Sequence, residues 1–215
     1  MGARLKTAET RSMSSQQWLN RQINDPFVKL AKSKGYRSRA AFKLEEIDDK
    51  FHILKKGARI VDLGCAPGGW VQIALARGAS KVVGIDLLPV EPIPPAILIE
   101  GDFTSHGMDK RLIDELGGAP SVVLSDMAPN TMGHAQTDHL RIVMLVEQAM
   151  HFAIDVLPPG GVFVTKAFQG GETAPMLKLM RANFEHVKHF KPKASRAESS
   201  ELYLVALGKK AAPAE

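Results

Sequence analysis

Amphipathic stretches and short apolar runs alternate along most of the chain. Apolar residues recur at spacings of three and four between residues 38 and 51, which predicts a helix with one buried face. The apolar run at 59–62 predicts a buried strand that leads into the turn Gly64–Gly69. By the same criteria, we expect further helices at 70–77, 108–116, 137–157 and 174–183, and further strands at 81–86, 96–100, 121–126, 162–166, 186–190 and 202–206.

Strands that alternate with helices are typical of an α/β protein with a doubly wound, mostly parallel sheet. The 215 residues suit one such domain. We expect this domain at 36–208, after an N-terminal arm at 1–35 and before a flexible tail at 209–215. Ligands of such sheets bind beyond the carboxyl ends of the strands, where the strand order reverses.

Charge is distributed unevenly over these parts. Residues 1–43 contain ten Lys or Arg and two acids, so they carry +8, whereas the rest of the chain carries −3 and the whole chain +5. A basic arm beside a mildly acidic domain predicts a polyanionic partner, with nucleic acid first. Trp18, Phe27, Tyr36 and Phe42 lie among these charges and are available to stack on bases. The alternative is a solvated arm whose aromatic residues pack on the domain.

Several classes of protein are excluded or disfavoured. A single cysteine excludes an internal disulfide and a thiolate metal cage. No uncharged apolar run reaches the roughly 18 residues of a membrane helix, and the histidines lack the spacing of metal ligands. We therefore expect no metal and no membrane association, and we expect a cytoplasmic monomer. The basic, Ser-rich residues 1–22 leave a mitochondrial address as the lesser alternative.

Charged residues end successive predicted strands. They are Asp62, Asp86, Asp126 and Lys166, and Asp102 lies just past the third strand. A single carboxylate there is explained as a helix cap or a turn residue, but a row of them at one sheet edge indicates a ligand site.

The turn also constrains the ligand. Its pattern, Gly64-x-x-x-Gly68-Gly69, lacks the Gly-x-Gly-x-x-Gly of a dinucleotide fold. Asp86 has the place of an acid that accepts hydrogen bonds from both ribose hydroxyls of an adenosine, and Asp102 is placed to bind an adenine amino group. S-adenosylmethionine, which has no pyrophosphate, is therefore the alternative to a dinucleotide. A nicotinamide oxidoreductase is the least favoured class.

Five segments of the sequence resemble the FtsJ/RrmJ (RlmE) family of S-adenosylmethionine-dependent RNA ribose 2′-O-methyltransferases. They are Asp62-Leu-Gly-Cys-Ala-Pro-Gly-Gly-Trp70, Asp86-Leu-Leu-Pro89, Gly101-Asp-Phe103, Ser125-Asp-Met-Ala-Pro-Asn130 and Lys166-Ala-Phe-Gln-Gly170. The resemblance extends over about residues 18–209. It is greatest to the bacterial members that methylate a uridine in the A-loop of large-subunit rRNA. It implies a Rossmann-like fold of seven strands, the last antiparallel. The loop at 170–173 departs from the family pattern.

The resemblance also implies the site residues. The family's catalytic Lys-Asp-Lys-Glu tetrad falls on Lys43, Asp126, Lys166 and Glu201. Its positions for S-adenosylmethionine, together with the glycines of the turn, give the candidate cofactor site: Gly64, Gly68, Gly69, Trp70, Asp86, Asp102 and Asp126.

Methylation of a ribose hydroxyl requires alignment of oxygen, methyl carbon and sulfur, and removal of one proton. We hypothesise that Lys166 takes this proton after losing its own in the assembled complex. The competing hypothesis is that Lys166 stays charged and stabilises a developing alkoxide. Asp126 would orient Lys166 and the cofactor, and Glu201 would position Lys43 or the hydroxyl.

The RNA is expected across the tetrad, with its phosphates held by Lys32, Lys34, Arg37, Arg39, Lys191 and Arg196. RNA affinity should then fall steeply with salt. Charge reversal at Arg37 and Arg39 is expected to weaken RNA binding and to spare cofactor binding. Two alternatives stay open: a tRNA ribose methyltransferase, and a catalytically silent RNA-binding ribosome-assembly factor, against which the complete tetrad argues.

Overall fold

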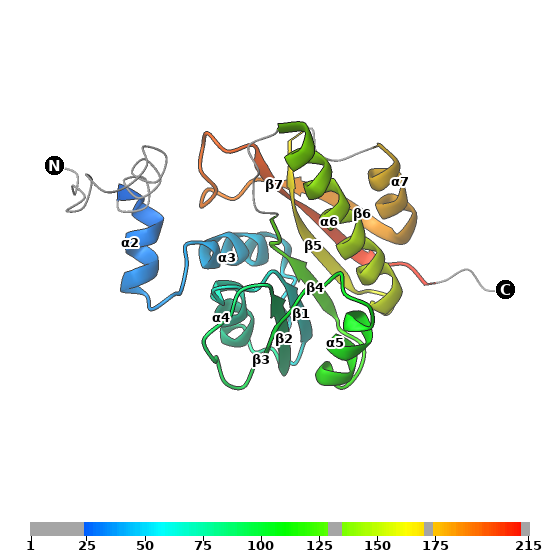
Figure 1. Ribbon diagram of the computed structural model, residues 1–215, viewed down its shortest axis with the longest axis horizontal. Coiled ribbons are helices and arrows are strands. Elements are labelled where there is room, and N and C mark those ends of the chain that lie inside the picture. The colour runs from blue at the N-terminus through cyan, green and yellow to red at the C-terminus, as the bar shows by residue number, and fades with distance from the viewer. Residues whose placement is uncertain (1–23, 129–134, 170–173, 212–215) are drawn as a thin grey trace.

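A seven-stranded sheet lies between two layers of helices in the computed structural model, which describes residues 24–128, 135–169 and 174–211 (Figure 1). The strands are β1 (Arg59–Leu63), β2 (Lys81–Asp86), β3 (Ile97–Glu100), β4 (Val122–Ser125), β5 (Val162–Phe168), β6 (Phe184–Phe190) and β7 (Glu201–Lys209). The helices are α2 (Pro26–Ser33), α3 (Ala40–Phe51), α4 (Gly69–Ala76), α5 (Met108–Leu116), α6 (Ala135–Val156) and α7 (Ala174–Asn183).

The order of the strands is β3-β2-β1-β4-β5-β7-β6. Strands β1 to β5 pair in parallel, whereas β7 runs antiparallel to β5 and to β6. The predicted fold class, a Rossmann-like, mostly parallel sheet with an antiparallel last strand, is confirmed.

The last two strands are longer than the sequence pattern predicts. Pairing of β6 with β7 extends from Phe190 opposite Tyr203 to Phe184 opposite Lys209. The amide of Lys209 also donates to the Gly161 carbonyl at 2.9 Å. Residue 209, which we expected to begin the tail, is therefore the final residue of the sheet.

Helix α2 lies inside residues 1–35, which we expected to be a basic RNA-binding arm and where we predicted no helix. Asp25 caps it, because its carboxylate accepts hydrogen bonds from the amides of Phe27 and Val28. Pro26 occupies the first helical position, where its missing N–H is not needed. The pair Asp25-Pro26 is thus a start signal that the sequence analysis missed.

Two apolar cores cover the faces of the sheet. Side chains of α5, α6 and α7 pack on one face with Val61 and Leu63 of β1. Those of α3 and α4 pack on the other face with Ile60. Because side chains alternate along a strand, Asp62 points to the α3 and α4 side. A third, smaller cluster joins α2 to α3 through Ala31 and Phe42.

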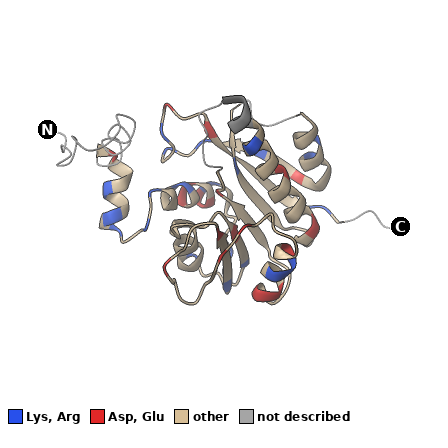
Figure 2. Ribbon diagram, in the orientation of Figure 1, with Lys and Arg blue, Asp and Glu red and all other residues tan. Residues whose placement is uncertain are grey.

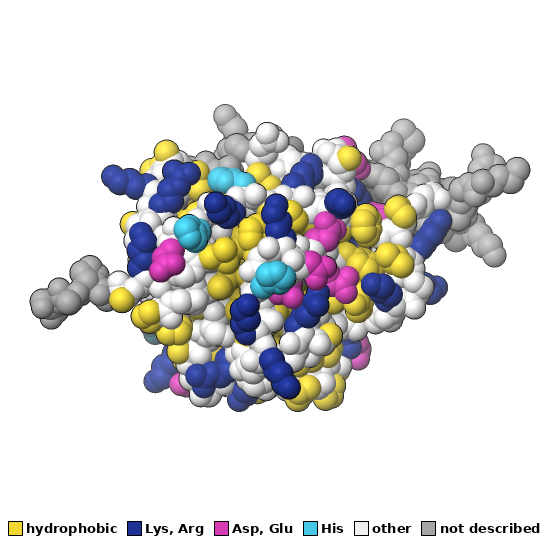
Figure 3. Space-filling model, turned by 180° about the vertical axis from the view of Figure 1, so that it is seen from behind, with side chains coloured by type: hydrophobic (Ala, Val, Ile, Leu, Met, Phe, Trp, Pro, Cys, Tyr) yellow, Lys and Arg dark blue, Asp and Glu magenta, His cyan; other side chains and the backbone are white. Residues whose placement is uncertain are grey.

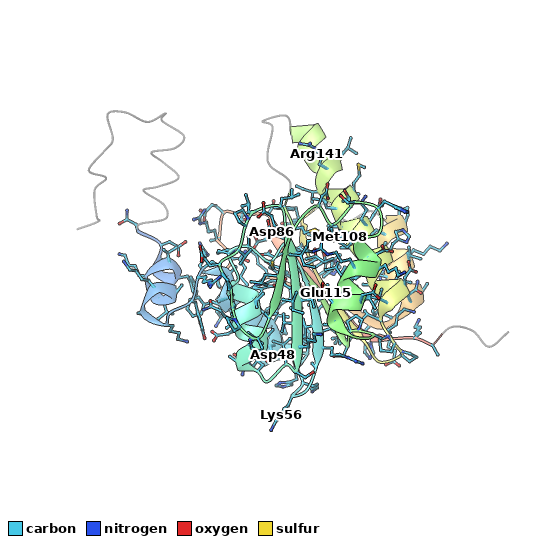
Figure 4. The ribbon with its side chains drawn as sticks, turned by 60° about the horizontal axis from the view of Figure 1, so that its bottom comes forward. Asp48, Lys56, Asp86, Met108, Glu115 and Arg141 are labelled. Atoms are coloured by element: carbon cyan, nitrogen blue, oxygen red, sulfur yellow. The ribbon has the colours of Figure 1, made fainter. Side chains whose placement is uncertain are left out.

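The strand order reverses between β1 and β4, which places a ligand site at the carboxyl ends of these strands. Figure 4 shows this edge: Asp86, at the end of β2, lies at the top of the sheet, and Lys56, shortly before β1, lies at the bottom. Trp18, the first 23 residues of the arm and the loop at 170–173 lie outside the described residues.

Candidate functional site

The four predicted tetrad residues come together at the carboxyl edge of the sheet. Lys43 of α3 forms an ion pair with Glu201, whose Oε1 lies 2.6 Å from the lysine Nζ. Lys166 of β5 lies beside Asp126, with 3.2 Å between Nζ and Oδ1. The same Nζ donates to the Asp126 carbonyl oxygen at 2.6 Å. The tetrad thus consists of two ion pairs, each between a lysine and a carboxylate.

Tyr203 joins the two ion pairs into one network. Its hydroxyl donates to Asp126 Oδ1 at 2.8 Å and accepts from Lys43 Nζ at 3.2 Å. Tyr203 is fully buried. The sequence analysis did not select it, although it follows Glu201 by two residues and so shares that residue's face of β7.

The antiparallel pairing of β5 with β7 explains why these residues meet. Tyr203 lies directly opposite Lys166, and Glu201 lies opposite Phe168. Helix α3 packs over this face and supplies Lys43 from a position far away in the sequence.

The network fixes the charge of its central carboxylate. Burial alone would raise the pKa of Asp126, but the ammonium groups of Lys166 and Lys43 outweigh burial and hold that pKa below its ordinary value. Burial, with Asp126 and Glu201 nearby, raises the pKa of Tyr203 well above its ordinary value. Asp126 is therefore a carboxylate and Tyr203 a neutral donor across the physiological pH range.

The glycine turn packs directly against the tetrad. Gly64 has a φ of +79°, and a Cβ there would lie within 2.9 Å of the backbone of Met127, the residue after Asp126. Only glycine allows this approach. Gly68, with a φ of +107°, then caps α4, which begins at Gly69.

Two predicted adenosine-binding acids lie at this edge. Asp86 Oδ2 accepts from the Ala66 amide in the turn at 2.9 Å, and Oδ1 accepts from the Leu88 amide at 2.9 Å. Asp86 therefore holds the turn while its partly exposed carboxylate remains at the rim. Asp102 is exposed beyond β3, and its Oδ1 accepts two hydrogen bonds from Thr104 at 2.8 Å each.

Trp70 is a buried link between helices. Its indole N–H donates to the Ala40 carbonyl of α3 at 2.8 Å, and its ring centroid lies 5.6 Å from that of Tyr203. The side chain is only 3% exposed. Trp70 therefore connects the start of α4 to α3 and to Tyr203. Its contact with a cofactor stays a prediction.

Asp62 is a buried carboxylate on the same side of the sheet. It is 1% exposed, and neither of its oxygens has a hydrogen-bond partner among the described residues. Burial raises its pKa well above the ordinary value, and Asp126 and Asp86 raise it further. Asp126 and Asp86 thus each lie close enough to Asp62 to disfavour its charged form.

Of the predicted RNA-binding residues, Lys32 and Lys34 lie exposed at the end of α2. Lys34 Nζ is 3.9 Å from Glu45 Oε2, a pair that contributes little because the lysine is about half exposed. In Figure 2, α2 and the segment that leads from it to α3 carry conspicuous blue bands.

The other four candidates make contacts within the protein. Arg39 contacts Asp25 and the Ala194 carbonyl, and Arg196 Nε lies 3.5 Å from Asp25. Lys191 donates to the Ser199 carbonyl at 2.6 Å. The Arg37 guanidinium donates to three carbonyl oxygens beside the glycine turn.

Within 24–128, 135–169 and 174–211, no group of three or more His, Cys, Asp or Glu could hold a metal ion. No helix of these segments is both long and apolar enough to span a membrane.

The model of the FtsJ-like methyltransferase family matches residues 36–209, most of the chain. The protein belongs to this family. The FtsJ-like match includes all four tetrad residues, the glycine turn and Asp86.

Relatives of this FtsJ-like protein cover nearly its whole length. The ribosomal RNA large subunit methyltransferase E of Caulobacter vibrioides is 63% identical over 96% of this chain and 91% of its own. That of Granulibacter bethesdensis is 59% identical over 95% of this chain and 89% of its own. A crystal structure of a ribosomal RNA methyltransferase from Plasmodium falciparum has a TM-score of 0.73 at 33% identity. It covers 82% of this chain and 100% of that chain.

Proposed function

We propose that this protein transfers a methyl group from S-adenosylmethionine to the ribose 2′-oxygen of a uridine in the A-loop of large-subunit rRNA. The observation that carries the proposal is the network of Lys43, Glu201, Lys166, Asp126 and Tyr203 beside the glycine turn. A network of lysines and carboxylates can orient a hydroxyl and accept its proton during the reaction. The full-length relatives named as large-subunit rRNA methyltransferases support the substrate class.

The residues beside the turn suit S-adenosylmethionine. The cofactor would supply an activated methyl group on a cationic sulfonium. The glycines of the turn would let a ligand approach the backbone closely, and Asp86 and Asp102 would accept hydrogen bonds from the ribose and the adenine. Asp86 leaves a partly exposed carboxylate at this edge, which would attract a cationic cofactor.

We propose that Lys166 interacts directly with the reacting 2′-hydroxyl, either as a base or as a charged stabiliser. In the structure, its Nζ acts as a donor toward the carboxylate and the carbonyl of Asp126. As a base, Lys166 would first release a proton to solvent as RNA binds over the site. It would then accept the proton of the 2′-oxygen as that oxygen forms its bond to the methyl carbon, while the carbon–sulfur bond breaks and a neutral thioether leaves. As a charged stabiliser, it would instead donate to the developing alkoxide.

We propose that the RNA approaches over α2 and the tetrad. Lys32 and Lys34 are the leading candidates for phosphate contacts because they are exposed. The other four candidates already have partners in the protein, so they would chiefly stabilise the surface on which the RNA binds. They are Arg37, Arg39, Lys191 and Arg196. The opposite face supports this choice, because its Lys and Arg side chains are mixed with acidic and apolar ones (Figure 3).

We propose that the protein acts as a monomer in the cytoplasm and that its substrate is rRNA within a large ribosomal subunit. The relatives named as large-subunit rRNA methyltransferases support the rRNA of this proposal. A tRNA substrate is the second candidate, because the tetrad's chemistry applies to any ribose.

The test is transfer of a labelled methyl group from S-adenosylmethionine to large subunits that lack the modification. Naked rRNA and tRNA serve as parallel substrates, and Lys166→Ala is the inactive control. We expect label in the rRNA of the subunit, at one A-loop uridine, and at least about a hundredfold less label with the variant.

Two results would contradict the proposal. Label only in tRNA would keep the chemistry and overturn the substrate. No label in any RNA, with cofactor and RNA both bound, would identify a silent assembly factor.

A further inference from the structure

Arg37 connects the two segments that border the predicted cofactor site. Its Nη1 donates to the Pro67 carbonyl of the glycine turn at 3.2 Å and to the Glu91 carbonyl at 2.5 Å. Its Nη2 donates to the Pro92 carbonyl at 2.9 Å. Glu91 and Pro92 belong to the proline-rich loop that follows Asp86, so a single guanidinium holds this loop to the turn.

The backbone around Arg37 is held by the same part of the molecule. Its amide donates to Gln72 Oε1 at 2.8 Å, and Gln72 Nε2 donates to the Gly35 carbonyl at 3.0 Å. Gln72 lies on α4, the helix that begins at the turn. Gln72 therefore fixes the chain on both sides of Tyr36 and directs the Arg37 side chain toward the turn.

Close packing completes the connection. A Cβ at Gly68 would lie 2.5 Å from Ile93 Cδ1 and 3.4 Å from Arg37 Cδ. The proline-rich loop, the turn and the stem of Arg37 thus meet at Gly68. Asp86 lies between turn and loop and is bonded to both through Ala66 and Leu88.

An arginine suits this position for a geometric reason. The planar guanidinium carries five N–H donors in a fixed fork, so it can bridge carbonyl groups from two segments at once. A lysine ammonium carries its three donors on one atom and cannot span the same acceptors in this fixed geometry.

We propose that Arg37 is a positioning residue of the cofactor site, which holds the proline-rich loop against the glycine turn so that Asp86 faces the ribose of S-adenosylmethionine. This inference rests on the proposed function. It also changes the expectation for Arg37, since loss of its side chain should weaken cofactor binding before it weakens RNA binding.

The test measures two dissociation constants for the full chain: that of S-adenosylmethionine by calorimetry without RNA, and that of rRNA without cofactor. Arg37→Ala should raise the first at least about tenfold, because several hydrogen bonds to one charged group are lost. Arg37→Lys should recover only part of this loss, and added free guanidinium should restore binding to Arg37→Ala. Lys29→Ala, a change to an exposed basic residue of α2, should leave the cofactor constant unchanged.

Gln72→Leu provides a second variant in case Arg37→Ala does not fold. It should weaken cofactor binding in the same direction, because it releases the Gly35 carbonyl and the Arg37 amide, which hold the backbone on both sides of Tyr36. Unchanged cofactor binding in Arg37→Ala, with weakened RNA binding, would overturn the inference and make Arg37 a phosphate contact. Failure of the unaltered protein to bind S-adenosylmethionine would instead overturn the proposed cofactor.

Discussion

At the scale of single residues, Tyr203 shows how the site is held together. One hydroxyl accepts from Lys43 and donates to Asp126, so each lysine–carboxylate pair restrains the other. Hydrogen bonds to charged groups in a buried setting are stronger than neutral ones. The position of Lys166 beside Asp126 therefore depends on β7 and α3 as well as on its own strand.

Asp62 represents the opposite case, a buried carboxylate without a partner among the described residues. Its pKa is raised in the folded protein, so between the unfolded and the folded pKa the folded state binds more protons than the unfolded state. Protonation of Asp62 therefore stabilises the folded protein relative to the unfolded chain. This stabilisation is complete below the unfolded pKa of about 4 and is lost as pH rises toward the folded pKa.

Asp62→Asn removes this dependence. Without cofactor, the free energy of unfolding of the variant minus that of the unaltered protein should increase with pH above about 4, by at most about 1.4 kcal/mol per pH unit. Urea unfolding at pH 5, 6, 7 and 8 measures this difference. Asp114→Asn, at an exposed position of α5, is the control and should give a flat difference. A flat difference for Asp62→Asn as well would contradict the account.

At the scale of elements, one carboxylate connects α2 to two other parts of the fold, beside the apolar cluster of Ala31 and Phe42. Asp25 caps the helix, pairs with Arg39 at the start of α3, and lies 3.5 Å from Arg196 in the β6–β7 connection. Burial lowers the pKa of Arg39, which Asp25 counteracts. Glu46 of α3 adds hydrogen bonds to the amides of Lys193 and Ala194.

Asp25→Ala should therefore loosen two elements together. We expect a loss of about 3 kcal/mol in the free energy of unfolding, because the buried Arg39 loses its carboxylate partner. Asp25→Asn keeps a capping oxygen and should lose about 1 kcal/mol less. Hydrogen exchange should show faster exchange in both α2 and residues 192–196. Faster exchange in α2 alone would contradict a shared attachment, and Lys29→Ala, exposed on the same helix, should change neither.

The sequence predicts most elements well and some boundaries poorly, for physical reasons. The helix at α5 and the strand at β2 have clear periodicity and stop signals, and both are found with the predicted bounds. Strand β7 is longer than predicted because its end is set by pairing with β6, which no local pattern reveals. Helix α2 could have been predicted from Asp25-Pro26, whose cap and first-position signals are local.

At the scale of the whole molecule, the site depends on contacts between distant parts of the chain. The reversal of strand order places β1 and β4 together, and the antiparallel β7 brings Glu201 and Tyr203 to the carboxyl end of β5. Residue types and family resemblance selected the four tetrad residues. They could not select Tyr203 as the link or Arg37 as the bridge between loop and turn, because both roles depend on distant partners. Tyr203 bonds Lys43 and Asp126, which lie 160 and 77 residues away, and Arg37 bonds Pro92, which lies 55 residues away.

The proposed activity of this network is methylation of a ribose oxygen. The most direct measurement is alkaline hydrolysis of rRNA labelled by the unaltered protein, by Lys166→Ala and by Lys166→Arg. In alkali, the 2′-hydroxyl of each ribose attacks the adjacent phosphate and cleaves the RNA, and a 2′-O-methyl group prevents this cleavage. We therefore expect label in an alkali-resistant dinucleotide for the unaltered protein and almost none for Lys166→Ala. Lys166→Arg should be equally inactive if Lys166 is the base, and substantial activity would favour the charged stabiliser. Label released as alkali-sensitive mononucleotide, or equal labelling by Lys166→Ala, would contradict the claim.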